Sequence, residues 1–549
     1  MTASGRTFRS DAAAPDTRPL PSGVSRAAPP RIGIGKRRET TPISRRGSEM
    51  TRMHLAWPVA AAVLLLTEQA TAQPTVPAPV APSTTEPSNG ESPPPPTPQD
   101  RSAVPAVRRA RTGSNSANYP KPQVQSIFAS SSPAKGPLSK IGQSLADKGV
   151  YFRFLAVDEF AGSVSGGQGT GVGNSYALPF GADLDLDRMV GIPGAFVHVS
   201  MNTSRGSSLS ADHAGNAISF QTRYKTYHNL RLAALAIEQN LFDGHVNISG
   251  GRVSPLTYFN QSAIYCTFQS NSVCFNPAVV PIQDRALGFF PYGTWGGRIK
   301  VSPSKTFYVQ AGVFEANTTL NATNGFDWST RGSTGHQTAV EIGFQSPPKA
   351  ANPWHLRIGG YHNTSDVGDP YLNTERQPRI AAAGAALMHD GQAGGYVMGD
   401  VVGWHLGGDA KRPVTVFGGV IASANDYLPF KGQAIAGVIA TGPFKGRPDD
   451  TLGLVGSYIR LGSRQVDYLE AARARAGGTD PVRLGEGVFE LNYGIAVARG
   501  VRINPNIQYV VNPDNLPRPT AVHQSKNILA FGLRVSVDFA TILGLPASK

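Results

Sequence analysis

Cysteine, charged residues and long apolar runs are all scarce in this sequence. Its 549 residues include two Cys, too few for a four-cysteine zinc site or a disulfide-rich scaffold. Charged residues make up 16%, below the ~25% of an ordinary soluble domain, which argues against a typical cytosolic enzyme. Apart from one short segment near the start, no stretch approaches the ~18 consecutive apolar residues of a membrane-spanning helix. A helical membrane protein is therefore excluded.

The first 135 residues are interpreted as targeting and linker sequence. A basic residue, Arg52, precedes an apolar run over residues 55–66 and the small residues 70–72. This pattern predicts a leader over residues 1–72, with a secretory signal peptide at 53–72 that is cleaved after Ala72. Residues 73–135 are rich in Pro and Ser and poor in aromatic residues, so we expect a disordered Pro-rich linker.

Most of the positive charge lies in this same region. Residues 1–135 hold 17 basic and 8 acidic side chains, which is +9 of the net charge of +14. A nucleic-acid-binding protein would need a basic face in its folded part. No nucleic-acid partner is expected.

From residue 136 onward the recurring pattern is alternation of apolar and polar residues. Near the end of the chain, Phe531 and Leu533 alternate with Gly532 and Arg534. Such alternation also fits a soluble sandwich. Three features favour a membrane barrel: the export signal, runs of about ten residues, and aromatic residues such as Trp295 near the ends of apolar faces.

Length then sets the number of strands. Spread over 16 strands, residues 136–549 give roughly 26 residues for each strand and its connection, as in a porin with short turns at one end and long loops at the other. The predicted fold class is all-β, a transmembrane antiparallel β-barrel of 16 strands. The triplet 242–244, Phe-Asp-Gly, predicts a tight hairpin, and Leu138, Ile141 and Leu145 predict a short helix before the barrel.

Alternation also predicts which side chains face the lumen, where they would contact permeating solutes. Arginine and carboxylate side chains offer donors and acceptors for hydroxyl groups, although any one of them can equally be a solvated wall residue. The candidates are Arg298, Lys300, Glu341, Glu490, Asn492, Arg502, Asn504, Asn506, Gln508, Arg534 and Asp538.

The two cysteines, Cys266 and Cys274, enclose a short polar stretch in an expected outer loop. Because the chain is exported to an oxidising compartment, a disulfide is the expected state and a reactive thiol pair the alternative. Loop-closure entropy for so small a ring gives about 2.5 kcal/mol of stabilisation.

Signals for catalysis are weak throughout the sequence. The glycine-rich run 166–173 does not complete a nucleotide-binding motif and is interpreted as a loop between strands. No G-x-S-x-G or H-E-x-x-H motif occurs, and His355 and His362 have no carboxylate pattern around them. We predict no catalytic residue, no metal ligand and no cofactor.

Several segments, in order and at consistent spacing, resemble the carbohydrate-selective porin family (OprB type). They are residues 149–159, 166–198, 238–252 and 508–514, including Gly191, Pro193, Gly194 and Asn512. The resemblance implies a 16-stranded passive channel of the bacterial outer membrane that favours glucose and other small sugars. One departure is that outer-membrane barrels generally end on an aromatic residue recognised by the insertion machinery, whereas here ten residues follow Phe539.

The expected function is therefore an outer-membrane diffusion channel that passes small carbohydrates through a polar lumen. Its expected partners are those sugars, outer-membrane lipids and the barrel-insertion machinery, with the barrel either a monomer or a homotrimer. An outer-membrane barrel hydrolase and a closed structural or adhesive barrel are the alternatives.

Overall fold

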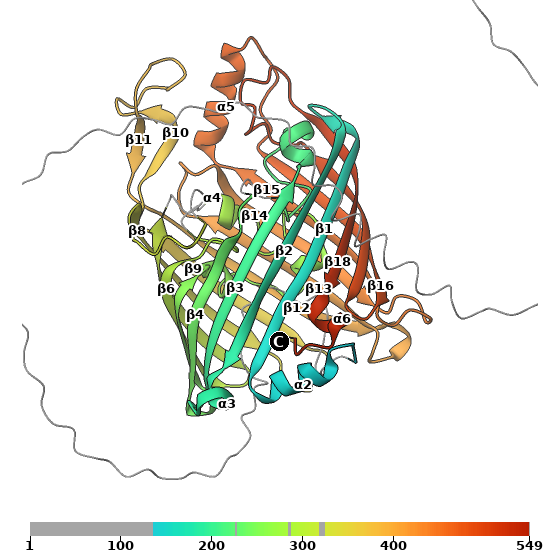
Figure 1. Ribbon diagram of the computed structural model, residues 1–549. Coiled ribbons are helices and arrows are strands. Elements are labelled where there is room, and N and C mark those ends of the chain that lie inside the picture. The colour runs from blue at the N-terminus through green and yellow to red at the C-terminus, as the bar shows by residue number, and fades with distance from the viewer. Residues whose placement is uncertain (1–134, 225–227, 284–286, 318–323, 548–549) are drawn as a thin grey trace, which may run out of the picture. The chain divides into compact units, whose positions relative to one another are not determined.

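The computed structural model describes residues 135–547 except 225–227, 284–286 and 318–323. The predicted leader, signal peptide and nearly all of the linker lie outside the described residues. Sixteen antiparallel strands form a closed barrel in which the first strand pairs with the last (Figure 1). The predicted fold class and strand number are confirmed. The strands are β1 (Val150–Gly167), β2 (Gly171–Asp185), β3 (Ala195–Gly206), β4 (Arg231–Leu241), β5 (Val246–Val253), β6 (Thr294–Ser304), β7 (Phe307–Asn317), β8 (Ser333–Gln345), β9 (Trp354–Asn363), β12 (Gln392–His405), β13 (Pro413–Ser423), β14 (Phe430–Thr441), β15 (Thr451–Leu461), β16 (Gly485–Ala498), β17 (Val501–Val511) and β18 (Lys526–Asp538).

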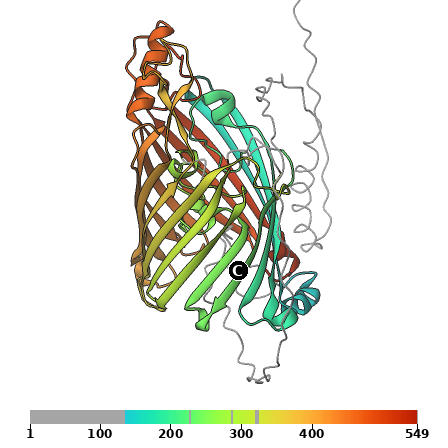
Figure 2. The same ribbon diagram turned by 90° about the vertical axis from the view of Figure 1, so that its left-hand side faces the viewer.

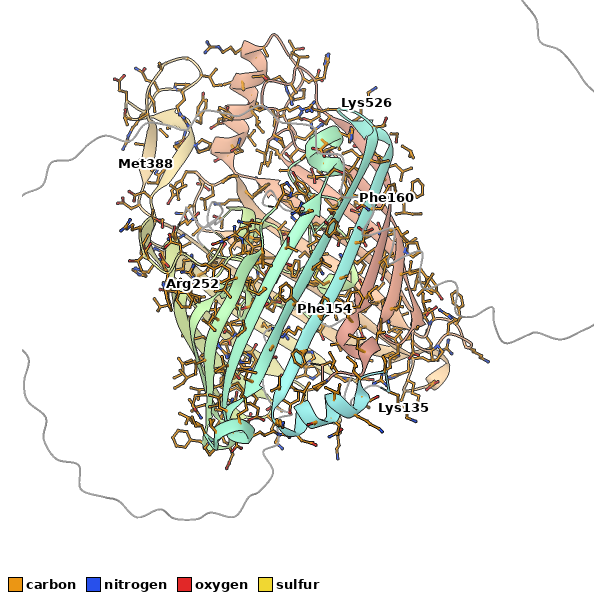
Figure 3. All side chains as sticks on the ribbon, in the orientation of Figure 1. Lys135, Phe154, Phe160, Arg252, Met388 and Lys526 are labelled. Carbon is orange, nitrogen blue, oxygen red and sulfur yellow. A yellow bond between two sulfur atoms is a disulfide. The ribbon has the colours of Figure 1, made fainter. Side chains whose placement is uncertain are left out.

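The two faces of each strand differ as the alternation predicts, with apolar residues outside and polar residues inside. On β18, Phe531 is 45% exposed whereas Arg534 is 2% exposed. On β1, Phe154 and Phe160 lie on the exposed face (Figure 3). A soluble protein would place these two classes the other way round, so the outer surface of the barrel suits hydrocarbon.

Connections at the two ends of the barrel differ in length. At one end β16 and β17 are joined by residues 499–500 alone, and β4 and β5 by the 3-10 turn η3 (Phe242–Gly244). Phe242, Asp243 and Gly244 all have positive φ, which is the tight hairpin predicted there. At the other end the loops are long, for example 207–230, 254–293, 364–391 and 462–484. Short turns face the periplasm in outer-membrane barrels, so the long loops lie on the outer side.

Two of the outer loops carry regular structure. The loop between β9 and β12 contains a two-stranded sheet of β10 (Val367–Asn373) and β11 (Ala386–His389), and the loop before β16 contains α5 (Ser463–Arg475). Both lie at the same end of the barrel (Figure 1). Within the described part of the chain, no helix is long and apolar enough to cross a membrane.

Both ends of the described chain meet at the periplasmic rim, near α3 (Leu186–Val190) (Figures 1 and 2). The predicted short helix is present as α2 (Ser139–Asp147), and the last strand is followed by α6 (Phe539–Leu543). Gly142 of α2 approaches the chain after α6 so closely that a Cβ there would lie 2.1 Å from the carbonyl oxygen of Gly544. The backbone N–H of Phe152 on β1 donates to the Pro546 carbonyl at 2.8 Å. The segment after Phe539 is thus packed between α2 and β1.

Candidate functional site

The long segment between β5 and β6, residues 254–293, folds into the barrel and is called the inner loop from here on. It contains η4 (Pro255–Thr257), η5 (Tyr265–Thr267) and α4 (Val279–Gln283). The Asn260 N–H donates to Glu341 on β8 at 3.2 Å, and the Gln269 N–H donates to Glu490 on β16 at 2.8 Å. Because these strands belong to different sides of the barrel, the inner loop crosses the lumen.

The two cysteines lie within this loop and form a disulfide whose Cα atoms are 4.2 Å apart. The expectation of an outer position needs correction, because the loop starts at the outer end but its cysteines are buried inside the barrel. Arg534 on β18 donates from Nη1 to the Cys266 carbonyl at 2.8 Å. Its other side binds Glu159 on β1, with Nη2 and Oε1 2.7 Å apart. The disulfide-closed turn is therefore fixed to the seam between the first and last strands.

Two strands away from Arg534, on the same side of the barrel, β16 holds the next part of the inner loop. The Glu490 carboxylate accepts from the backbone N–H groups of Gln269 and Ser270, the latter at 2.7 Å. Asn492 donates from Nδ2 to the Thr267 carbonyl at 2.9 Å. Glu490 is 1% exposed, so these charge-assisted bonds compensate a carboxylate that would otherwise be buried at high cost.

A second outer segment, residues 207–230 with the π-helix η2 (Ser210–Ala214), packs on the inner loop. Thr222 donates from Oγ1 to the Gln269 carbonyl at 2.6 Å, and the Arg223 N–H donates to Glu159 Oε2 at 2.7 Å. Gln508 on β17 donates to the Phe220 carbonyl at 3.1 Å. The two segments thus narrow the lumen as one hydrogen-bonded body.

On the wall formed by β2 to β8, polar side chains are linked from strand to strand in a polar belt. Its links include His198 Nδ1 to Asp183 Oδ1 at 2.8 Å, Asn247 Nδ2 to Glu238 Oε1 at 2.9 Å, and Gln310 Nε2 to Glu341 Oε1 at 2.8 Å. The members are Asp183, His198, Glu238, Asn247, Arg298, Gln310 and Glu341, with Arg153 of β1 paired to Asp183. Because acids and bases alternate along the belt, their fields largely cancel.

Two basic residues of the belt region lie against aromatic rings. Lys300 Nζ is 3.9 Å from the ring centroid of Tyr308, and the Arg298 guanidinium is 4.7 Å from that of Tyr258 in the inner loop. Cation–π contact holds each charge at a fixed place on the wall.

Two of the predicted lumen residues lie near the periplasmic end instead. Arg502 donates to the carbonyls of Gly494 at 3.2 Å and Asp449 at 2.9 Å. Asp538 caps α6 by accepting from the Thr541 N–H at 3.1 Å. In the adjacent turn, burial raises the pKa of Asp450, but hydrogen bonds from Arg447 and Tyr493 outweigh it and leave the pKa below its usual value.

Several amide oxygens on the inward faces of β16 and β17 are enclosed without a hydrogen-bond donor among the described residues. Asn492 Oδ1, Asn504 Oδ1 and Gln508 Oε1 are buried and accept no hydrogen bond from the residues that the structure describes. Asn506 instead uses its amide to donate to Gln269 Oε1 at 2.8 Å.

The structure thus brings seven predicted residues to the two inward segments, namely Arg298, Glu341, Glu490, Asn492, Asn506, Gln508 and Arg534. Glu159 was missed, although it lies on an alternating run as Arg534 does. Gln269 and Arg223 were missed because nothing in a loop sequence marks a residue that turns inward.

His355 and His362 both lie on β9, but the expectation that His355 has no carboxylate partner needs correction. His355 on β9 and Asp400 on β12 are direct cross-strand partners, with Nδ1 and Oδ2 2.7 Å apart. The pairing comes from strand register and so has no signature in the linear sequence. Among the described residues no group of three or more His, Cys, Asp or Glu side chains is arranged to hold a metal ion.

Comparison with known proteins agrees with this architecture. Residues 170–539 match the family described as "Carbohydrate-selective porin, OprB family". "Porin B" of Pseudomonas aeruginosa is 26% identical over 412 residues, which cover 72% of this chain and 88% of that protein. "Putative porin QuiX" of Acinetobacter baylyi is 24% identical, with 72% and 91% covered. The high-pH structure of Pseudomonas putida OprB superimposes with a TM-score of 0.68 at 25% identity, covering 75% of this chain and 99% of that one.

Proposed function

This chain belongs to the carbohydrate-selective porin (OprB) family of the bacterial outer membrane, and we propose that it passes small neutral sugars such as glucose by diffusion through its lumen. The earlier resemblance to this family is confirmed. The observation that carries the proposal is the inner loop, which crosses a polar lumen and is held by Glu490 and Arg534.

The charge pattern supports a neutral solute. Glu159 and Arg534 form a buried ion pair, and acids and bases alternate along the polar belt. A lumen with a strong field of one sign would favour ions of the opposite sign. Paired charges leave fixed hydrogen-bonding groups with little net field, which is what a sugar with many hydroxyls and no charge requires.

Selectivity then depends on width and hydrogen bonding. A permeating sugar has to exchange hydrogen bonds with the polar groups that line its path while it passes the inner loop. Each such bond has to be weak enough to break, because transport needs release as well as entry.

We further propose that this barrel has no catalytic activity. Liposome swelling with a panel of saccharides tests both points: sugar-dependent swelling supports the channel. Ester hydrolysis without swelling would support the barrel hydrolase, and zero conductance in planar bilayers would support a closed structural barrel.

Assembly is proposed to use the barrel-insertion machinery, with Phe539 recognised inside the chain. Its ring packs on that of Phe154 on β1, with centroids 4.8 Å apart, so the aromatic residue lies at the barrel seam despite the residues that follow it. Replacing Phe539 with Ala tests this by the yield of inserted barrel. Crosslinking in intact membranes distinguishes a monomer from a homotrimer.

A further inference from the structure

One side of the outer surface is hollowed by an apolar groove of about 560 Å³, lined by residues of β9 and β12 to β16. These strands form the left-hand wall in Figure 2. The volume falls within the roughly 300–1,000 Å³ of small-molecule sites. We call this recess the outer groove.

Strand register explains the groove. Gly399, Gly418, Ala436 and Gly456 are direct cross-strand partners in succession, so four small residues form one outward-facing row. Leu356 ends the row on β9, where it pairs with Gly399, and Phe489 ends it on β16, where it pairs with Gly456. At ~4.8 Å per strand, the floor is about 24 Å long.

The neighbouring outward rows stand higher on both sides. Val401, Val416 and Leu454 belong to one of these rows, and Val397, Val420 and Tyr458 belong to the other. Tyr458 and Val420 are 50% and 58% exposed, as expected for side chains that project from the barrel. The two ridges lie about 14 Å apart, four residues along the strands. The recess between them is long, and it is open on one side at Ala434, which lies between Val420 and Tyr458 in the second row.

An arginine lies at the outer end of the same surface. Arg460 is four residues beyond Gly456 on β15, about 14 Å along the strand, and alternation places it on the outward face. It is exposed, and it forms no ion pair or hydrogen bond within the part of the chain that the structure describes. At the outer rim of a barrel an Arg costs little, roughly 0–1 kcal/mol, because it can reach headgroups.

We propose that the outer groove binds an acyl chain of a phosphorylated outer-leaflet lipid, with the lipid phosphate on Arg460. The groove faces hydrocarbon and its floor carries no charged residue, so its occupant has to be apolar. Arg460 supplies the complementary charge for a headgroup at the water interface, and Arg binds phosphate with two parallel hydrogen bonds.

A second copy of the barrel fits this recess less well. A stable protein contact needs roughly 800 Å² per partner with complementary surfaces. The ridges at Val401 and Val420 keep the strands of another barrel away from the glycine floor, whereas a single flexible chain can lie on it. The site is separate from the lumen, so sugar permeation is not expected to depend on it.

Ala436 is the position at which to fill the groove. A Cβ added at Gly418 would lie 2.8 Å from the Ile435 carbonyl oxygen, so that glycine cannot be changed without moving the strand. Ala436 already carries a Cβ on the floor, so Ala436→Phe fills the groove without this clash. The matched control is Ala311→Phe, because Ala311 also faces outward but lies between Ile299 and Val340, away from the groove.

Arg460→Gln removes the proposed phosphate contact. Its matched control is Arg205→Gln, since Arg205 is likewise an exposed, outward arginine at the outer end of a strand, β3. Detergent-solubilised protein is titrated with lipid A and with dephosphorylated lipid A, and bound lipid is measured by native mass spectrometry.

We expect both A436F and R460Q to weaken lipid A binding roughly tenfold, the order expected from loss of one charge-assisted contact or of the buried chain. A311F and R205Q should bind as the unchanged protein does, and removing the phosphates should have the effect of R460Q. Equal binding by all variants would overturn the proposal. Dissociation of an oligomer by A436F, without change in lipid binding, would also overturn it and assign the groove to a second copy.

Discussion

Glu159 on β1 and Arg534 on β18 are direct cross-strand partners, and their side chains form a buried ion pair across the seam that closes the barrel. The same arginine binds the Cys266 carbonyl of the inner loop, and the same glutamate binds the Arg223 N–H. One ion pair thus connects barrel closure with both segments that narrow the lumen.

Replacing Arg534 with Ala is expected to lower the free energy of unfolding by about 3–5 kcal/mol, because it leaves the Glu159 carboxylate buried without its partner. Thermal or denaturant unfolding in detergent, followed by tryptophan fluorescence, measures the change. In the double variant Glu159→Gln with Arg534→Met, the free energy of unfolding should fall by less than in Arg534→Ala, because no uncompensated charge remains. A double variant as unstable as the single one would contradict this explanation.

Opening the disulfide should loosen the inner loop. Replacing Cys266 and Cys274 with Ser removes about 2.5 kcal/mol of stabilisation from this small ring. We expect larger fluctuations of the open-channel current in planar bilayers. A reducing agent should affect the unchanged protein in the same way and leave the serine variant unaffected. If the current fluctuations are equally small in the unchanged protein, in the reduced protein and in the serine variant, Glu490 and Arg534 hold the loop without the disulfide.

Glu490→Gln should displace the inner loop from β16. An uncharged amide oxygen accepts the Gln269 and Ser270 N–H groups more weakly than the carboxylate does, by roughly 1.5–3 kcal/mol in total. Single-channel conductance should rise and discrimination between mono- and disaccharides should fall in liposome swelling. Glu375→Gln is the matched control, because Glu375 is exposed in an outer loop. Equal changes in both variants would point to a general effect of charge.

Arg502 lies near the periplasmic mouth, and Arg502→Ala should change single-channel conductance or the block by sugar. Loss of this cation should also shift the reversal potential in a salt gradient toward cation selectivity, because a fixed positive charge favours anions. Arg502→Lys should keep the unchanged selectivity. Unaltered conductance and sugar affinity in Arg502→Ala would remove this residue from the permeation path.

The outer sheet of β10 and β11 should open in acid. Burial raises the pKa of Asp369, but hydrogen bonds from His389 and from the Leu372 and Tyr371 N–H groups outweigh it, so the pKa lies below its usual value. A lowered pKa stabilises the folded loop above the unfolded value of about 3.9, and this contribution is lost as the pH falls through the folded pKa.

Hydrogen exchange of β10 and β11, corrected for the intrinsic rate, should therefore increase below about pH 4. Asp369→Asn should show the faster exchange already at neutral pH. Slow exchange of this variant at neutral pH would show that the stacking of His389 on Tyr427, with centroids 3.9 Å apart, is sufficient to hold the sheet.

Alternation predicted the wall of the barrel because side-chain direction in a strand is a local property. The positions of Glu490 and Arg534 followed from their neighbours in sequence. The contact between Glu490 and Gln269 did not, since 221 residues separate them and the inner loop carries no periodic pattern. The His355–Asp400 pair and the row from Gly399 to Gly456 have the same origin: both come from strand register, which a single strand does not encode.

The segment after Phe539 binds to surfaces on α2 and β1, which are the first described elements of the chain. The segment can reach these surfaces only after β18 has paired with β1, because it directly follows β18. It therefore acts as a latch that forms once the barrel has closed. The described chain ends at Ala547, beside this latch and on the periplasmic side. An affinity tag attached at this end is expected to disturb the contacts of the segment with α2 and β1. A tag in the outer loop between β10 and β11 would leave these contacts unchanged.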